Sequence, residues 1–414
     1  MGNGFARHAI VLGLLAAIGP FSIDMYLPAL PTIAAQFDTS VAAAQASLVA
    51  FVAAVGLCQV VYGPVSDMVG RRGPLYFGLA LYICGAVGCA LAPNIATLIT
   101  FRFVQGIGGC AGIVISRAIV RDLYQGPDAA RLMALIMLVF SVSPMLAPLA
   151  GSGLIAVAGW RAIFAVVTLI GFFGLALVAF ALPETRPADK RVASGLGNAL
   201  AGYANLLRDP YYIGVVLIGG FGLSGFFLFL ATSSFVYIDH FGLTTTQFSL
   251  AFAVNAIGFI GAAQFSSPFA RRFGFARVVK FAAAAYAAVM LALLALTISG
   301  IDRLPVLMAM LFLSYACLGL IVPTTAVMAF EAHGPIAGMA AALMGTIHMS
   351  VGIMAVTLLS LFFDGSAAAM IAAIAACAFC AFLLSRVTLR ANGAYTQAAV
   401  DSPGSDLHGS AESR

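Results

Sequence analysis

A few charged side chains lie inside long apolar stretches of this sequence, and they are the residues that could do chemistry. Asp24 is the first, since it is the only charged residue between positions 9 and 36. If such a stretch crosses a membrane, a carboxylate near its middle costs roughly 2.5–3.5 kcal/mol on insertion scales, so it is rare unless it is paired or functional. Asp24 is therefore either a hydrogen bonder between helices or a carboxyl group that gains and loses a proton, and we favour the proton carrier.

Arg102 is the cation that we expect beside Asp24. It follows Ile95, where its apolar stretch begins, by about seven residues, which places it ~10 Å inside a helix that rises 1.5 Å per residue. Asp24 falls in the same half of the bilayer, so we predict that the two side chains pair. Gln105 stands one turn beyond Arg102 on the same helix face. Arg117 is deep enough in this stretch to need a partner as well.

The other reactive side chains give no sign of catalysis. All seven cysteines fall inside apolar stretches. The spacing Cys377-x-x-Cys380 is typical of redox or metal sites, but no acidic residue or histidine stands beside it, so we expect both thiols to pack as small apolar groups. The sequence shows no nucleophile and base set and no cluster of metal ligands. We therefore predict that the protein is not an enzyme, with no catalytic residue, no metal site and no cofactor.

Composition explains why the charged residues stand out. Hydrophobic residues make up 62% of the 414 positions and charged residues only 8%, and the mean hydropathy is +1.06. A hydrocarbon layer of ~30 Å needs ~20 helical residues to cross. Twelve apolar runs of that length occur, near residues 9–36, 43–66, 74–93, 96–120, 132–157, 162–182, 211–238, 245–268, 278–299, 304–330, 335–363 and 366–385. We predict an all-α membrane protein with twelve transmembrane helices.

The basic residues indicate how these helices are oriented. With the N-terminus in the cytoplasm, the loop Lys and Arg residues fall on the cytoplasmic side, and only Arg161 and Arg303 fall outside. We expect Arg121 and Asp122, at the cytoplasmic end of the fourth run, to be solvated. The net charge of +5 reflects this orientation and gives no reason to expect nucleic-acid binding. We predict a multi-pass protein of the bacterial inner (cytoplasmic) membrane with both termini in the cytoplasm.

A short charged turn occurs twice in the chain. The stretch from Gly63 to Arg72 returns in degraded form at residues 267–274, where Gly274 matches Gly70. A repeat of about half the chain length indicates two homologous halves, so we predict two pseudo-symmetric six-helix bundles. The expected domains are an N-terminal bundle at 1–182, a cytoplasmic linker at 183–209, a C-terminal bundle at 210–388 and a disordered cytoplasmic tail at 389–414.

The first copy of the turn carries the spacing G-x-x-x-D-x-x-G-R-R between the second and third apolar runs. This spacing resembles the signature loop of the major facilitator superfamily, and the sequences RFVQG from Arg102 and LPET from Leu182 also resemble motifs of that family. The resemblance spans the whole chain and implies the major facilitator fold. It implies that the cytoplasmic gate joining the two bundles is formed by Gly63, Asp67, Gly70, Arg71 and Arg72.

The fifth apolar run resembles the antiporter motif of the same family, G-x-x-x-G-P-x-x-G-G. Its positions fall at Pro144, Ala147, Pro148 and Gly151, and Ser143, Ala147 and Ser152 stand where the motif has glycines. Small residues four apart allow another helix to approach closely. The softened match favours export over uptake.

Two further segments resemble the bicyclomycin and chloramphenicol resistance group of drug/proton antiporters. They are the sequence DMYLP from Asp24 and the pattern R-x-x-x-R-D-L-Y from Arg117. The resemblance implies a proton-coupled exporter of drugs or other small molecules, which works by alternating access. Its partners would be a lipophilic small molecule, protons and the bilayer, and it would act as a monomer. The alternative is a proton-coupled metabolite uptake symporter or a facilitator of the same fold.

The second half of the chain offers uncharged groups for a substrate. The candidate cavity residues are aromatic or polar and lie near the expected midplane of the membrane: Phe21, Tyr26, Phe226, Asn255 and His348. Asn255 and His348 could equally form hydrogen bonds between helices. His348 can titrate, which makes it the chief rival of Asp24 as the proton carrier.

Overall fold

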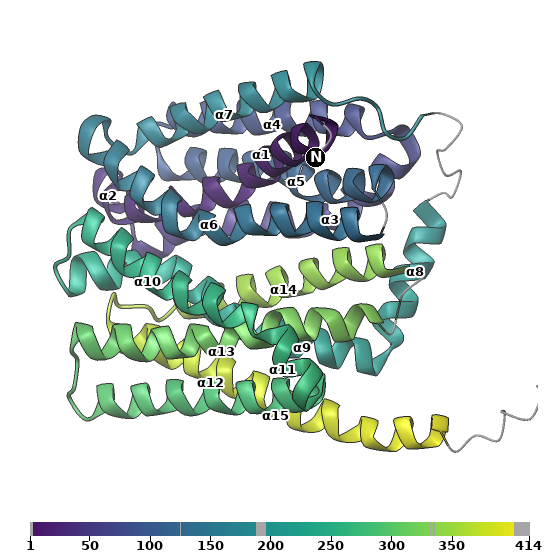
Figure 1. Ribbon diagram of the computed structural model, residues 1–414. Helices are drawn as coiled ribbons and strands as arrows, with labels where there is room; N and C mark the ends of the chain where they lie inside the picture. The colour runs from purple at the N-terminus through teal and green to yellow at the C-terminus, as the bar shows by residue number, and fades with distance from the viewer. Residues whose placement is uncertain (1–2, 125, 188–195, 332, 334–335, 401–414) are drawn as a thin grey trace, which may run out of the picture.

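The computed structural model describes residues 3–124, 126–187, 196–331, 333 and 336–400. Over those ranges the regular structure is entirely helical, and twelve helical segments are long and apolar enough to cross a membrane. The prediction of an all-α protein with twelve spans is confirmed. The helices form two layers (Figure 1), with α1 to α7 in the upper one and α9 to α15 in the lower one.

The upper layer is the N-terminal bundle. Its elements are α1 (Asn3–Asp24), the short 3-10 helix η1 (Leu27–Ala29), α2 (Leu30–Gln36), α3 (Val41–Val69), α4 (Arg72–Ala90), α5 (Ile95–Leu123), α6 (Gly126–Ala158) and α7 (Arg161–Phe180). α5 packs against both α3 and α4, and α1 packs against α5 and α6. Helix α5 therefore lies at the centre of this bundle.

The lower layer is the C-terminal bundle. Its elements are α9 (Pro210–Ser234), the π-helix η3 (Phe235–His240), α10 (Thr245–Gln264), α11 (Ser266–Phe273), α12 (Phe275–Ile298), α13 (Leu304–Glu331), α14 (Ala337–Ser360) and α15 (Ala367–Val400). α8 (Leu196–Arg208) lies within the segment that we expected to be a polar linker. α15 continues as helix to Val400, past the expected beginning of a disordered tail. Residues 391–400 include four alanines, which favour helix, beside Gly393, which does not.

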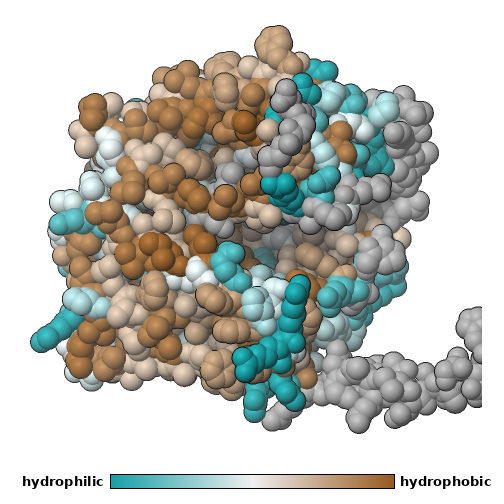
Figure 2. All heavy atoms as spheres, viewed as in Figure 1, coloured by the Kyte–Doolittle hydropathy of each residue, from teal (hydrophilic) through white to brown (hydrophobic). Residues whose placement is uncertain are grey.

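The surface matches a protein surrounded by lipid. Figure 2 shows hydrophobic residues spread over the flank of both bundles, while hydrophilic residues gather toward one end of the helices. Large apolar side chains such as Phe77, Phe180 and Phe281 are exposed on this flank or elsewhere on the surface. The interior and the lipid-facing surface are both hydrophobic, so burying apolar surface does not by itself drive the helices together. Their association depends on close packing and on polar contacts.

The first span, which we predicted as one helix over the run 9–36, is broken. α1 ends at Asp24, η1 follows, and α2 begins at Leu30. Pro28 and Pro31 explain the break, because proline has no N–H to donate and its ring clashes with the preceding turn. The break leaves Asp24 as the last residue of α1, inside the bundle.

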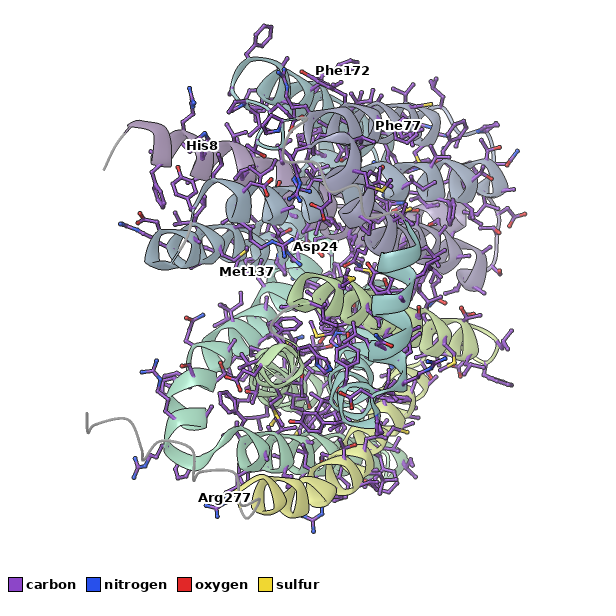
Figure 3. All side chains as sticks on the ribbon, turned by 90° about the vertical axis from the view of Figure 1, so that its right-hand side faces the viewer. His8, Asp24, Phe77, Met137, Phe172 and Arg277 are labelled. Atoms are coloured by element: carbon purple, nitrogen blue, oxygen red, sulfur yellow. The ribbon has the colours of Figure 1, made fainter. Side chains whose placement is uncertain are left out.

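The two bundles contact each other along α3 and α14 and along α6 and α10. Thr346 Oγ1 of α14 donates to the Gly56 carbonyl of α3 at 2.7 Å, and Gln45 Nε2 of α3 donates to the Ala231 carbonyl of α9 at 3.1 Å. Figure 3 looks along the helices from one end, and the label of Asp24 falls close to the boundary between the two layers.

Close packing of α5 depends on glycine. A Cβ at Gly108 would overlap the Gly78 carbonyl and the Tyr82 amide of α4, and a Cβ at Gly106 would overlap the Phe51 carbonyl of α3. These neighbours are backbone atoms, so they cannot rotate away.

We expect Gly108→Ala to force α4 and α5 apart, at a cost of about 1–3 kcal/mol, as overpacking generally does. The measurement is the thermal midpoint of the purified protein in detergent. Gly153→Ala in α6 is the matched control, because nothing lies within 4 Å of its Cβ position. An equal midpoint for both variants would contradict the packing argument.

Candidate functional site

Asp24 is buried, with 4% of its surface exposed. Its Oδ2 accepts a hydrogen bond of 2.9 Å from Ser143 Oγ of α6. The carboxyl group therefore joins the broken first span to the fifth span. Ser143 is itself fully buried, so water does not compete for this contact.

Arg102 is also fully buried, and its surroundings are aromatic. The guanidinium carbon lies 4.5 Å from the ring centre of Tyr26, 4.4 Å from that of Phe51 and 5.9 Å from that of Phe164. Such cation–π contacts stabilise a desolvated cation by about 2 kcal/mol. We call Tyr26, Phe51 and Phe164 the Arg102 cage.

Two oxygens complete the surroundings of Arg102. Its Nη1 donates to Gln105 Oε1 at 2.8 Å and to the Ser22 carbonyl of α1 at 3.3 Å. Both Gln105 and Ser22 are buried. The predicted sharing of a face by Arg102 and Gln105 is thus a direct contact.

The predicted ion pair between Asp24 and Arg102 is wrong for this structure. The ion pairs of the described residues do not include one between these two side chains. The reason is local: the carboxyl group at the end of α1 is bonded to α6, whereas Arg102 is held by its cage and by the backbone of α1 two residues earlier. Arg102 thus contacts the backbone two residues before Asp24 and not the carboxyl group itself.

Tyr26 was expected to line a substrate cavity, but the structure places it elsewhere. Its hydroxyl shares a 2.6 Å hydrogen bond with Ser47 Oγ, its ring belongs to the Arg102 cage, and none of its surface is exposed. Phe21 is partly buried against the core of the same bundle. Tyr26 thus positions Arg102 instead of facing a cavity.

α6 is the element that connects Asp24 to the other bundle. Gly151 lies directly on the Met25 carbonyl, next to Asp24, where no side chain would fit. One helix turn earlier the Pro148 carbonyl accepts a 2.9 Å hydrogen bond from Ser249 Oγ of α10. Ala147 is buried and Pro144 lies directly after Ser143 in the same helix. The sequence identified these small residues, but it gave no sign that Ser143 would bind Asp24.

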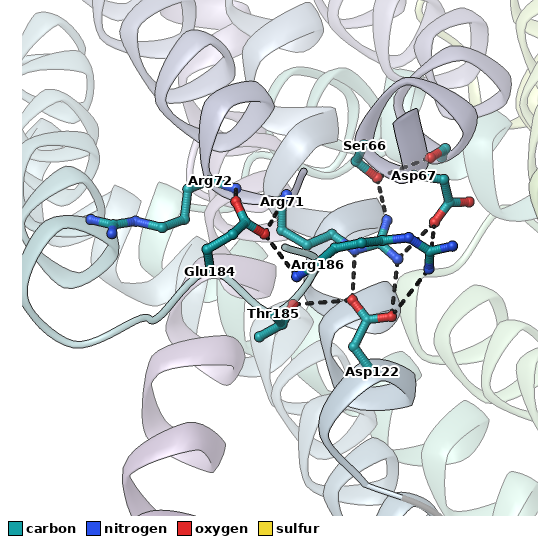
Figure 4. Close-up of polar contacts among 9 residues, drawn as sticks. Ser66, Asp67, Arg71, Arg72, Asp122, Glu184, Thr185 and Arg186 are labelled. Carbon is teal, nitrogen blue, oxygen red and sulfur yellow. Dashed lines mark hydrogen bonds and ion pairs between the residues drawn. The ribbon is translucent and has the colours of Figure 1, made fainter. Parts of the chain in front are cut away.

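The charged turn forms the second polar centre, which Figure 4 shows. Arg71 Nε and Nη2 donate to the two carboxylate oxygens of Asp122 at 2.7 and 3.1 Å, and Arg71 Nη2 lies 2.7 Å from Asp67 Oδ1. Nη1 donates to Ser66 Oγ at 2.6 Å. Only 2% of the Arg71 side chain is exposed. Burial by itself lowers the pKa of Arg71, but the hydrogen bonds and charges of Asp122 and Asp67 outweigh burial and raise it.

The segment after α7 completes this centre. The Glu184 carboxylate accepts the backbone N–H groups of Arg71 at 2.9 Å and of Arg72 at 3.1 Å, where α4 begins. Arg186 Nη1 lies 3.2 Å from Asp67 Oδ1 and 3.5 Å from Asp122 Oδ1. A carboxylate is stabilised by the free N–H groups at a helix N-terminus. We call Ser66, Asp67, Arg71, Asp122, Glu184 and Arg186 the Arg71 network.

One expectation about this region is wrong. Asp122 is not solvated as predicted, since its side chain is only 12% exposed and binds Arg71. Glu184 and Arg186 lie in the predicted linker, and both bind the turn. The LPET sequence could have pointed to Glu184. Arg121 is exposed as expected, and Arg117 of α5 is partly buried; its role stays a prediction.

The second copy of the turn keeps the backbone conformation of the first copy but, among the described residues, not its ion pairs. Gly70 and Gly274 both adopt the left-handed region, with φ of 99° and 85°. Arg271 and Arg272 are exposed, and the ion pairs found in the described chain involve neither. The repeat therefore preserves a turn that only glycine adopts easily.

The C-terminal bundle contains the remaining candidates. His348 is buried, and its Nε2 lies 3.1 Å from the Val216 carbonyl of α9, so the ring joins two helices of one bundle. Asn255 is buried on α10, and Phe226 is partly buried on α9. Of the residues predicted to share one cavity, Tyr26 and His348 lie inside different bundles, so the structure does not bring the set together.

The sequence matches a known protein family over most of its length. Residues 12–357 match the family model described as Major Facilitator Superfamily. The chain belongs to the Major Facilitator Superfamily. This membership makes the protein a membrane-embedded transporter of small molecules and not an enzyme.

Two relatives within the superfamily differ in what their names say. The chain is 36% identical to the uncharacterized MFS-type transporter YdgK of Bacillus subtilis (strain 168), over 83% of this chain and 86% of that protein. It is 31% identical to the bicyclomycin resistance protein homolog of Haemophilus influenzae, over 66% of this chain and 69% of that protein.

Solved structures of the Major Facilitator Superfamily share the fold at low identity. The crystal structure of a D-xylose-proton symporter matches with a TM-score of 0.69 at 17% identity, over 93% of this chain and 96% of that one. The human organic anion transporter MFSD10 matches with a TM-score of 0.66 at 21% identity, over 92% of this chain and 99% of that one. These likenesses establish the architecture alone.

Removing Arg71 should destabilise the protein more than removing an exposed arginine of the second turn. We expect Arg71→Ala to lower the free energy of unfolding by about 3–5 kcal/mol. The reason is that the Asp122 carboxylate stays buried after it has lost the Arg71 guanidinium. Asp122→Ala should add little to Arg71→Ala, since both break one pair. The measurement is the free energy of unfolding or the thermal midpoint in detergent.

Arg272→Ala is the control for this prediction, because Arg272 is exposed and lies over the Phe273 ring at 5.3 Å. Strictly additive losses for Arg71→Ala and Asp122→Ala would argue that the two side chains do not act as one pair.

Proposed function

We propose that this protein is a proton-coupled exporter of drugs or other small molecules, which exchanges an inward-moving proton for an outward-moving substrate. One observation carries the proposal: a buried carboxyl group at a helix break is bonded to the helix that contacts the other bundle. Asp24 lies at one end of this connection and Ser249 of α10 at the other. A change of charge at Asp24 thereby has a physical route to the boundary between the bundles.

Protonation changes what Asp24 can do. The ionised carboxylate only accepts hydrogen bonds and takes one from Ser143, whereas the protonated group is neutral and can also donate. The ionised group is attracted to the Arg102 guanidinium, and the neutral group is not. Loading and release of a proton would therefore shift the balance between α1 held on α6 and α1 drawn toward Arg102.

The Arg71 network is proposed to act at the cytoplasmic end. It ties α3, α4, α5 and the segment after α7 into one rigid unit, so these helices would move together. Arg121, near the end of α5, lies beside Gly338 at the beginning of α14 in the other bundle. Separation of the bundles at this end would open a path to the cytoplasm.

The driving force suffices for export. A proton that moves inward through ~100 mV and across one pH unit releases about 2.3 plus 1.4 kcal/mol. That sum supports a concentration ratio of a few hundred for the exported molecule, so one proton for each neutral molecule is enough. No cofactor is needed under this proposal.

The names of relatives support the choice of cargo. Besides the bicyclomycin resistance protein homolog, the chain is 29% identical to the multidrug resistance protein MdtL of Escherichia coli over 64% of this chain and 66% of that protein. We further propose a bacterial inner membrane location with both termini in the cytoplasm, and activity as a monomer. The basic residues of the loops support that orientation.

The test is proton movement into liposomes that contain the purified protein, under an imposed pH gradient and with added compounds. We expect chloramphenicol or a lipophilic cation to trigger proton flux, and Asp24→Asn to abolish it while the compound still binds. Normal coupling in Asp24→Asn would refute the role of this carboxyl group. Substrate and proton moving in the same direction would identify an uptake symporter instead.

Ser143→Ala tests the connection through α6. We expect slower coupled flux and a stability loss of about 1–3 kcal/mol, because a buried acceptor loses its donor. Ser152→Ala is the matched control, because Ser152 Oγ donates only within its own helix, to the Leu149 carbonyl at 2.9 Å. Equal fluxes for the two variants would remove Ser143 from the mechanism.

A further inference from the structure

The interior of the C-terminal bundle contains buried polar groups without hydrogen-bond partners. Tyr237 of η3, Asn255 of α10, Tyr286 of α12 and Tyr315 of α13 are each at most 3% exposed. The hydroxyl groups of all three tyrosines and both polar atoms of the Asn255 amide form no hydrogen bond within the part of the chain that the structure describes. Buried tyrosine hydroxyls and amides normally find partners, so four such side chains in one bundle need an explanation.

These groups are neighbours. The Tyr237 hydroxyl lies next to the Asn255 side chain, although the two do not reach hydrogen-bond geometry. Tyr237 and Tyr315 both pack against the ring of Phe229, with ring centres 6.1 and 5.4 Å from it. α13, which carries Tyr315, packs against α9, α10 and α12 in the lower layer of Figure 1.

Aromatic rings enclose the group and extend toward the other bundle. The ring centre of Phe229 lies 5.4 Å from that of Tyr315, and Phe229 is stacked on Phe252 with 5.4 Å between the ring centres. Phe226 lies 6.1 Å from Tyr315 and 6.3 Å from Phe227. Phe227 in turn lines a small cavity between the bundles with residues of α3 and α14. A continuous series of rings thus leads from the bundle boundary to the unpartnered hydroxyls.

The described residues of this region bury no Asp, Glu, Lys or Arg side chain. The buried charged side chains of the described chain are Asp24, Arg71 and Arg102, and all three belong to the N-terminal bundle. An ionised ligand group would lose its hydration here and meet no counter-charge. An uncharged group with a ring could stack on Phe229 or Phe226 and exchange hydrogen bonds with hydroxyls that both donate and accept.

We infer that Tyr237, Asn255 and Tyr315 form a binding subsite for the uncharged, hydrogen-bonding aromatic part of the transported molecule. This inference rests on the proposed function and adds a division of labour to it. The N-terminal bundle handles the proton at Asp24, and the C-terminal bundle recognises the neutral cargo. Movement of Phe226 and Phe227 as the bundles separate would open the subsite.

The test uses tyrosine to phenylalanine changes, which remove a hydroxyl group and keep the ring. Binding of chloramphenicol, which is neutral and has hydroxyl and amide groups, is measured for the purified protein by equilibrium dialysis. Tetraphenylphosphonium, a permanent cation without donors or acceptors, is the second probe. We expect Tyr315→Phe and Tyr237→Phe each to weaken chloramphenicol binding three- to tenfold, about the value of one hydrogen bond, and to leave tetraphenylphosphonium binding unchanged.

Stability separates a binding role from a structural one. The unpartnered hydroxyls stabilise nothing in the free protein, so Tyr315→Phe and Tyr237→Phe should keep or raise the thermal midpoint. Tyr212→Phe is the matched control, since its hydroxyl donates to the Ala340 carbonyl at 2.6 Å. It should lower the midpoint and leave chloramphenicol binding unchanged.

Three outcomes would overturn the subsite. They are unchanged chloramphenicol affinity in Tyr237→Phe and Tyr315→Phe, equal weakening of both probes, and a wild-type protein that binds tetraphenylphosphonium but not chloramphenicol. Proton flux driven by tetraphenylphosphonium would still support the proposed exporter in each case. The subsite and the proposed function can therefore fail independently.

Discussion

The cost of burying charge in an apolar bundle governs how this protein is built. Three charged side chains are buried in the described part of the chain, and each receives a different kind of compensation. Arg71 is matched by carboxylates, Arg102 by aromatic rings and oxygen dipoles, and Asp24 by one hydroxyl donor. Each form of compensation requires groups from several helices, so these charges determine which helices must pack together.

The three solutions differ in how easily they can change. Arg71 contacts two carboxylates and a serine hydroxyl, so any single movement breaks several charged contacts at once. Asp24 has one hydrogen bond, and its charge depends on a proton. The bundle thus combines a rigid charged centre at Arg71 with a labile one at Asp24. This combination suits a transporter in which one group of helices moves as a block and another site responds to protons.

The two halves of the repeat share a backbone turn but differ in the polar groups that they bury. Gly70 and Gly274 keep the same left-handed turn, yet only the first copy is surrounded by acidic partners. The C-terminal bundle instead buries neutral polar groups among aromatic rings. Symmetry in the backbone therefore coexists with asymmetry in the chemistry, which is what exchange of a proton for a neutral molecule would use.

The sequence by itself determined the helices, because a membrane span must be long, apolar and internally hydrogen-bonded, and those requirements can be read from consecutive residues. It also picked out Asp24, Arg102 and the charged turn, since a charge among apolar residues is conspicuous without any structure. It could not determine partners. Whether Asp24 meets Arg102 or Ser143, and whether Asp122 meets water or Arg71, depends on rotations and breaks that bring together residues 51 to 119 positions apart. Tertiary structure decided those contacts, because a difference of a few ångströms between helices selects one partner over another and leaves no trace in local sequence.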